Sequence, residues 1–245
     1  MTLEIILLIT IIFPITFMSA IRKCNRPFYV IGLSAIISAG LVLLYIAYLT
    51  VTKEMSLTAI LTEEMEKVLG TIKDNPNLHK LLPFGLSIND ENLLKNMAEL
   101  VGLTMPSFVF MVSSIIGYIA YSVAARIKNK DGAINLVKAR IANFSLQNKD
   151  VTGLFLIYIG AYLIKFAGFG IENAVLINVR IIVESIIAFQ GVAYIFTVTA
   201  MKKIPSALVG VLVVIVWMTG YGQTFLFFIG LFDLFFNVRK RQIRY

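Results

Sequence analysis

One stretch, residues 171–201, constrains the fold of this chain more than any other, because it is long and apolar yet carries a charged pair. It is longer than the roughly 20 residues that a helix needs to cross the hydrocarbon core of a bilayer. Arg180 and Glu184 lie four residues apart inside it, so both side chains project from one helix face. A charge near the bilayer centre costs at least about 2.5–3.5 kcal/mol and normally faces other helices or a wet cavity. The stretch therefore predicts a membrane-spanning helix with a polar centre.

The composition extends this prediction to most of the chain. Of the 245 residues, 58% are hydrophobic and 15% are charged, whereas a soluble domain is nearer to half apolar and a quarter charged. The apolar residues fall in blocks separated by polar segments, as in polytopic membrane proteins. The net charge of +8 comes from basic residues beside these blocks, where they anchor the topology and contact anionic lipid. This placement argues against a nucleic-acid partner.

We therefore expect an all-α protein, a polytopic transmembrane helix bundle of about seven spans (six to eight) with a helical extracytoplasmic insertion. The first two transmembrane helices occupy residues 1–52, and an amphipathic extracytoplasmic segment occupies 53–104. The rest of the bundle follows at 105–245, with a basic cytoplasmic loop at 126–150 and a basic tail. The expected spans are residues 1–20, 29–51, 106–125, 151–167, 171–201, 204–218 and 223–238. Pro14 is expected to kink the first span, and Pro106 to open the third.

The distribution of basic residues predicts the orientation. Most of the 22 lysines and arginines fall on one side in this scheme: after the first span, in the loop 126–150, at Lys202 and Lys203, and in the tail. The positive-inside rule then places the C-terminus in the cytoplasm and the N-terminus outside. We expect a multi-pass membrane protein in this orientation.

The polar residues of the fifth span are the candidate ligand-binding group. At 100° per residue, Asn173, Arg180, Glu184 and Tyr194 fall within about a quarter of the helix circumference, and Gln190 flanks them. Amide, guanidinium, carboxylate and hydroxyl groups in one stripe could bind a polar solute. The alternative is a structural ion pair that fixes the helix register. The sequence leaves both interpretations open.

Other polar residues have candidate structural or gating roles. Lys165, near the end of the fourth span, is expected to extend its ammonium outward. Asp233 lies just before the terminal basic cluster and shares a helix face with Lys240, which favours a local anchor at the cytoplasmic mouth.

Two A-x-x-x-A pairs are candidate helix-packing faces: Ala35 with Ala39, and Ala120 with Ala124. Such small residues let another helix approach closely. That helix belongs either to the same chain or to another protein.

Nothing in the sequence indicates an enzyme. It has no Walker loop, no G-x-S-x-G, no H-E-x-x-H and no paired intramembrane aspartates. Cys24 is the single cysteine and His79 the single histidine, which excludes an intrachain disulfide and a histidine-based centre. We expect no catalytic residue, no metal and no cofactor.

Three segments near the C-terminus carry a family resemblance: AFQGVA at 188–193, LFFIGLFD at 226–233 and NVRKR at 237–241. With Thr104-Met-Pro106 and Arg126, they make the chain resemble the YybS-like family of bacterial membrane proteins of unknown function (domain-of-unknown-function family 2232). Asp233 and Arg239 would correspond to recurrent acidic and basic positions of that family's last span.

The YybS-like family is similar to the substrate-binding subunits of energy-coupling-factor vitamin transporters. Those subunits bind small solutes and dock through A-x-x-x-A helices onto a separate ATPase module. They typically have six spans with both termini inside, which differs from the topology expected here.

Two function hypotheses follow. The first is a solute-binding subunit or small transporter of a bacterial cytoplasmic membrane, the location that the resemblance implies. Its partners would be the lipid bilayer, an unknown small solute, and an ATPase or coupling module or other membrane protein. The alternative is a non-transporting membrane scaffold that recruits protein partners.

Overall fold

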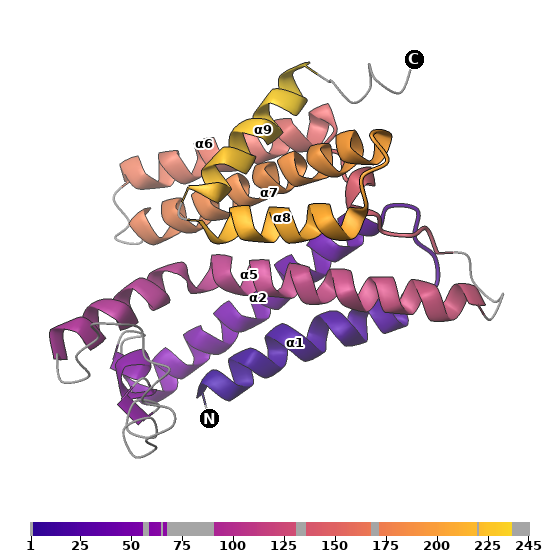
Figure 1. The fold of residues 1–245 in the computed structure, drawn as a ribbon. Coiled ribbons are helices and arrows are strands. Elements are labelled where there is room, and N and C mark those ends of the chain that lie inside the picture. Colours follow the sequence, from indigo (N-terminus) through magenta and orange to yellow (C-terminus); the bar gives the residue numbers. More distant parts are fainter. Residues whose placement is uncertain are drawn as a thin grey trace, which may run out of the picture. The chain divides into compact units, whose positions relative to one another are not determined.

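The computed structural model describes residues 2–55, 59–64, 66–67, 91–130, 136–167, 172–219 and 221–236, and these are helical apart from short connections. Figure 1 shows the helices. In chain order they are α1 (Thr2–Ala20), α2 (Pro27–Lys53), α5 (Glu91–Lys130), the short 3₁₀ helix η1 (Ile141–Asn143), α6 (Asn148–Ala167), α7 (Glu172–Met201), α8 (Ser206–Met218) and α9 (Gly222–Phe236). The predicted all-α fold class is confirmed.

Within the described residues, three helical segments are long and apolar enough to cross a bilayer: Pro27–Lys53, Asn96–Lys130 and Asn173–Met201. The pair α8 and α9 meets the same criterion as one broken span with a bend of 118°. The segment Glu4–Ala20 of α1 is apolar but shorter. By length and composition, three or four of the seven expected spans are therefore supported in this part of the chain.

Helix α5 differs most from the sequence prediction. We expected a span to begin at Pro106 and a loop to begin at residue 126, but one helix of 40 residues runs through both positions, with Pro106 inside it. Two hydroxyl groups near the proline bond main-chain carbonyls of the same helix: Thr104 Oγ1 donates to the Leu100 carbonyl at 2.9 Å and Ser107 Oγ to the Thr104 carbonyl at 2.8 Å. The expected boundary at residues 104 and 105 thus lies within a helix.

The chain divides into two compact units. Unit 1 comprises residues 1–21 and 31–120, and unit 2 comprises residues 22–30 and 121–245. The core of unit 1 joins apolar residues of α1, α2, α5 and the helical stretch 59–64: Ile6, Val42, Ile46, Leu61, Ala98, Met105 and Val109. Its interior also holds buried hydroxyls, and Ser113 Oγ of α5 donates to the Thr10 carbonyl of α1 at 3.3 Å.

Unit 2 is built on α7, against which α6, η1, α8 and α9 all pack. Its core centres on Ala188 and Val192 of α7 and Leu226 of α9, all nearly inaccessible. Before η1, the Asn129 side chain bonds both the N–H and the carbonyl of Leu136, at 2.7 and 2.8 Å. Unit 2 contains every predicted ligand-binding residue.

Candidate functional site

The candidate site lies where α9 crosses α7, at a point where two glycines bring the backbones into contact (Figure 1). A Cβ added at Gly191 of α7 would overlap the Leu226 carbonyl of α9, and one added at Gly230 of α9 would overlap the Ile187 carbonyl of α7. Each added Cβ would also come within 3.0 Å of the other glycine's nitrogen. Small residues permit such close approach between membrane helices. Larger side chains at either position would force the helices apart.

A buried polar pair stands beside this crossing. Gln190 of α7 is 2% exposed and Asp233 of α9 is 3% exposed. The Gln190 Nε2 donates to Asp233 Oδ2 at 2.7 Å, which links residues 43 positions apart in the sequence. In an apolar bundle, an unsatisfied carboxyl or amide costs several kcal/mol, so this hydrogen bond stabilises both groups. This contact is the polar centre of unit 2.

The carbonyl oxygen of the Gln190 side-chain amide accepts a second hydrogen bond. The Leu146 N–H, just before α6, donates to Gln190 Oε1 at 3.1 Å. The segment 141–146 is further attached to α7 because Thr197 Oγ1 donates to the Ala142 carbonyl at 3.1 Å. The carboxamide of Gln190 therefore joins three parts of the chain: α7, α9 and the segment that leads into α6.

Aromatic rings cover this junction. Phe144 packs edge-on against Phe189 of α7, with ring centroids 4.8 Å apart, and against Phe28 at 5.2 Å. Edge-to-face pairs of this kind stabilise by about 0.5–1.5 kcal/mol beyond their burial. Four consecutive residues of α7, from Gln190 to Ala193, are buried. A helix buried on all sides at one level is enclosed there by its neighbours.

The predicted charged pair lies elsewhere on α7. Arg180 Nε and Glu184 Oε1 are 2.7 Å apart, so the expected i, i+4 contact is formed. However, the two side chains are 62% and 35% exposed within this chain, whereas a polar centre enclosed by the bundle would bury them. The most buried polar groups of the helix are instead those of Gln190, Asn178 and Ser185.

The remaining predicted ligand-binding residues do not gather at one point. Asn173 is exposed near the start of α7, and Tyr194 is partly buried one turn after Gln190. The Asn178 Nδ2, which the sequence analysis did not select, donates to the Ala174 carbonyl at 2.8 Å. Gln223 of α9 reaches Ser185 of α7 at 3.3 Å. A second polar contact thus joins the same two helices.

The residues proposed as structural, gating or packing groups also differ in how far they are buried. Asp233 is a buried partner of Gln190, and Lys165 is exposed on α6. Ala35 is fully buried in unit 1, while Ala39, Ala120 and Ala124 are partly exposed. Arg239, Lys240, His79 and most of the segment 53–104 lie outside the described residues.

Among the described residues, no group of three or more histidine, cysteine, aspartate or glutamate side chains is arranged to hold a metal ion. The crossing itself offers one carboxyl and one carboxamide for hydrogen bonding. Such a pair binds amide, hydroxyl or ammonium groups.

Gln190 and Asp233 are both candidate residues from the sequence, but their positions in the chain do not predict their contact. They were assigned to different groups, one as the flank of a stripe and the other as an anchor for Lys240. Each stands close to a glycine, Gly191 and Gly230, within an apolar helix. A polar residue beside a glycine in each of two spans was the available signal for a close crossing.

Comparison with known proteins agrees with this architecture. The family model for predicted membrane proteins of unknown function, DUF2232, matches residues 2–234. The chain belongs to the DUF2232 family. No curated protein and no solved structure matches it. The DUF2232 match and the apolar helices together fit a multi-pass membrane location.

Proposed function

We propose that this DUF2232 protein is a solute-binding subunit or small transporter of a bacterial cytoplasmic membrane. One observation carries the proposal: the hydrogen bond between the buried side chains of Gln190 and Asp233 within an apolar helical unit. Ionisable residues inside membrane segments are costly, and they commonly mark solute or ion pathways. A purely structural crossing could use apolar residues around the two glycines at lower cost.

In this proposal, a polar solute replaces Gln190 as the partner of Asp233. The carboxylate would accept hydrogen bonds from an ammonium, amide or hydroxyl group of the solute, and Gln190 would offer both a donor and an acceptor. Because Gln190 also holds the Leu146 N–H, the exchange of partners would loosen the segment before α6. Solute binding at the crossing would therefore change the hydrogen bonds that join α7 to α9 and to the segment before α6.

The resemblance to energy-coupling-factor subunits supports an extension of this proposal, in which a separate ATPase module docks on the chain. The partly exposed Ala120 and Ala124 offer one such face. The scaffold hypothesis predicts docking without a solute. The two hypotheses are therefore distinguished by the presence of a bound small molecule.

The decisive experiment is native mass spectrometry of the purified protein, comparing wild type with Asp233→Asn. The substitution keeps the shape and one acceptor oxygen but replaces the other oxygen by an amide donor and so removes the carboxyl group. We expect wild type to retain a small polar molecule that Asp233→Asn loses, while Arg180→Leu with Glu184→Leu retains it. A wild-type protein that carries protein partners but no small molecule would establish the scaffold function instead.

The orientation belongs to the same proposal, with the N-terminus outside and the C-terminus in the cytoplasm. Single cysteines at Lys73 and Ser145, in a Cys24→Ser background, are treated with an impermeant thiol reagent in intact cells. We expect labelling at position 73 only. Labelling at position 145 alone would reverse the topology.

A further inference from the structure

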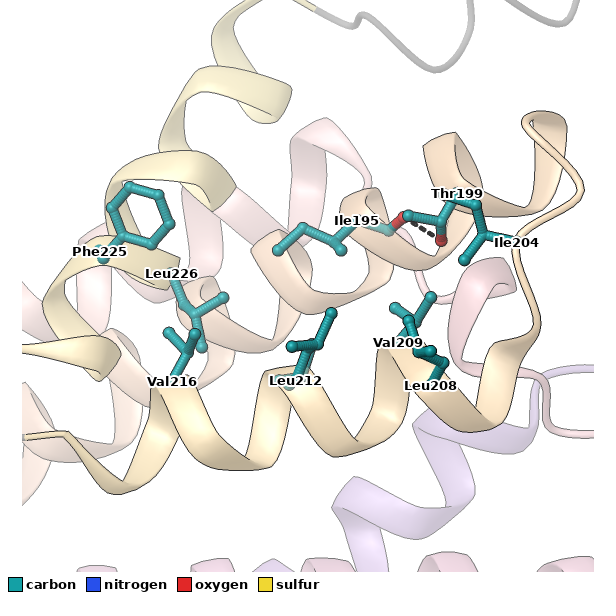
Figure 2. A pocket seen from close by; sticks show the side chains of 10 residues that line it. Ile195, Thr199, Ile204, Leu208, Val209, Leu212, Val216, Phe225 and Leu226 are labelled. Atoms are coloured by element: carbon teal, nitrogen blue, oxygen red, sulfur yellow. Dashed lines mark hydrogen bonds between the residues drawn. The ribbon is translucent and has the colours of Figure 1, made fainter.

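An apolar groove lies in unit 2 between α7, α8 and α9, and Figure 2 shows the side chains around it. Its volume is about 170 Å³, which is below the roughly 300–1,000 Å³ of pockets for drug-sized ligands. The deep wall is formed by Val209 and Leu226, which are 3% and 1% exposed. The rim is formed by exposed residues such as Leu208, Leu212 and Phe225. The groove therefore opens to the surroundings of the helices.

The lining offers no hydrogen-bonding group to a ligand. Nine of its ten residues are apolar, and the tenth is Thr199. The Thr199 hydroxyl already donates to main-chain carbonyls of α7, at 2.7 Å to Ile195 and 3.2 Å to Phe196. An occupant must therefore be apolar along the groove. Between Leu208 and Val216 the groove follows α8 for about 12 Å, since a helix rises about 1.5 Å per residue.

Two cations stand at one end of this groove. Thr199 and Ile204 line it, and the residues between them in sequence include the exposed Lys202 and Lys203. The N-terminus of α8 follows at Ser206, and the positive end of its dipole adds to the attraction for an anion. The carbonyls of Thr199 and Ala200, at the opposing end of α7, are occupied by the N–H groups of Ile204 and Lys203, both at 3.0 Å.

Lys203 occupies a backbone conformation that favours glycine. Its φ is 57°, and its two neighbouring hydrogen bonds form the Schellman motif that ends many helices with glycine at this position. A lysine here retains a cation where glycine would fit with less strain. The same motif turns the chain at Lys203, and Ile204, whose N–H bonds the Thr199 carbonyl, lines the groove.

We propose that this groove binds one acyl chain of an anionic phospholipid, whose phosphate lies on Lys202 and Lys203. The apolar lining excludes a polar solute, and the open rim faces the region where lipid chains lie. The two cations at one end match the geometry of a lipid, with a long apolar tail and an anionic head. The expected inside location of Lys202 and Lys203 agrees with the leaflet that carries anionic lipids.

The single tryptophan, Trp217, is a natural reporter for this site. It follows the lining residue Val216 on α8 and packs against the unit 2 core. The protein is reconstituted in bilayers that contain phosphatidylglycerol or phosphatidylcholine, with identical acyl chains carrying bromine, which quenches indole fluorescence on contact. We expect brominated phosphatidylglycerol to quench Trp217 at a much lower mole fraction than brominated phosphatidylcholine. Equal quenching by the two lipids would overturn the proposal.

Substitutions at the cations test the headgroup contact. Lys203→Gly removes the charge and suits the backbone, so the protein should remain as thermally stable as wild type or become more so. The preference for phosphatidylglycerol should fall about fivefold, the contribution of one basic residue at an anionic surface. Adding Lys202→Gln should remove about another fivefold. Lys149→Gln, an exposed lysine outside the groove lining, is the matched control, and an equal loss there would contradict a specific site.

Substitutions on α8 test the tail contact. Leu212→Phe places a ring on the groove rim, whereas Val211→Phe changes an equally exposed neighbour that does not line the groove. We expect the first to reduce quenching severalfold and the second to leave it unchanged. Native mass spectrometry is run on the same samples. If Leu212→Phe instead dissociates a dimer, a second copy of the chain fills the groove, and the lipid proposal is wrong.

Discussion

Two polar pairs on α7 have similar hydrogen-bond lengths and different surroundings. The Arg180–Glu184 contact and the Gln190–Asp233 contact are each 2.7 Å long. The first joins neighbours on one helix, with side chains 62% and 35% exposed. The second joins two helices, and its side chains are nearly inaccessible. The comparison shows that the charge of a residue and its position within a span do not identify the buried centre of a helical bundle.

The difference arises from how each pair is assembled. An i, i+4 pair forms wherever a helix forms, because the helix itself brings the two side chains together. The Gln190–Asp233 pair forms only because Gly191 and Gly230 let α7 and α9 touch. Its existence thus depends on the tertiary fold, whereas Arg180–Glu184 reports only that α7 is helical. The following predictions test this distinction, beginning with the largest effect.

The glycines of the crossing should be the least replaceable residues of unit 2. Gly191→Ala or Gly230→Ala puts a methyl group onto a backbone carbonyl of the facing helix. Overpacking a core typically costs about 1–3 kcal/mol, and a backbone obstacle places this case at or above the upper end. Thermal unfolding in detergent, followed by circular dichroism, measures the loss.

Gly160→Ala on α6 is the matched control for these substitutions, because nothing lies within 4 Å of a Cβ added there. Since alanine favours a helix interior over glycine by about 0.8–1.0 kcal/mol, this variant should be as stable as wild type or more stable. Equal losses at Gly160 and Gly191 would contradict the close crossing of α7 and α9.

The polar pair beside the crossing should show strong coupling. Gln190→Leu removes two hydrogen bonds, one to Asp233 and one from the Leu146 N–H, and the loss of a partner costs a buried group about 1–3 kcal/mol. Asp233→Leu leaves the bond between Gln190 and Leu146 in place and should cost less. The double substitution should be more stable than Gln190→Leu alone, because the carboxyl is no longer buried without its amide.

A double-mutant cycle on the free energy of unfolding measures that coupling. Additive effects of the two substitutions would mean that Gln190 and Asp233 are not in contact. In that case the candidate site would have to be sought elsewhere on α7.

The sequence predicted those parts of the fold that depend on local pattern. Apolar length located α2 and α7 to within a few residues, and the charge spacing predicted the Arg180–Glu184 contact. It divided α5 at Pro106, because proline usually marks a helix boundary whereas Pro106 lies inside this long helix. The pairing of Gln190 with Asp233 was not predictable from spacing, since 43 residues and a helix crossing separate them.

The exposed Arg180–Glu184 pair should contribute much less to the free energy of unfolding than the buried Gln190–Asp233 pair. Replacing Arg180 and Glu184 together by leucine should leave the free energy of unfolding nearly unchanged, since apolar replacements for both members of an ion pair in apolar surroundings are often neutral. Each single substitution should cost less than Gln190→Leu, and the same unfolding assay measures all three variants. Losses of several kcal/mol for the single variants would mean that another subunit buries this face in the membrane.

The smallest effect is expected for a third pair, Glu63 with Lys67, which lies in the polar segment and has the same spacing. Its Nζ–Oε1 distance is 2.6 Å and its side chains are 43% and 59% exposed. The hydrogen bond from Lys67 holds the pKa of the Glu63 carboxyl below its ordinary value. A lowered carboxyl pKa stabilises the folded state above the ordinary pKa, and this stabilisation is lost as the pH falls through the folded value. Lys67→Met should raise the Glu63 pKa toward its ordinary value, as followed by carboxyl NMR shifts assigned with Glu63→Gln. An unchanged pKa would mean that the Glu63–Lys67 pair does not form. The Arg180–Glu184 pair could then not be compared with an i, i+4 pair outside the membrane-spanning helices.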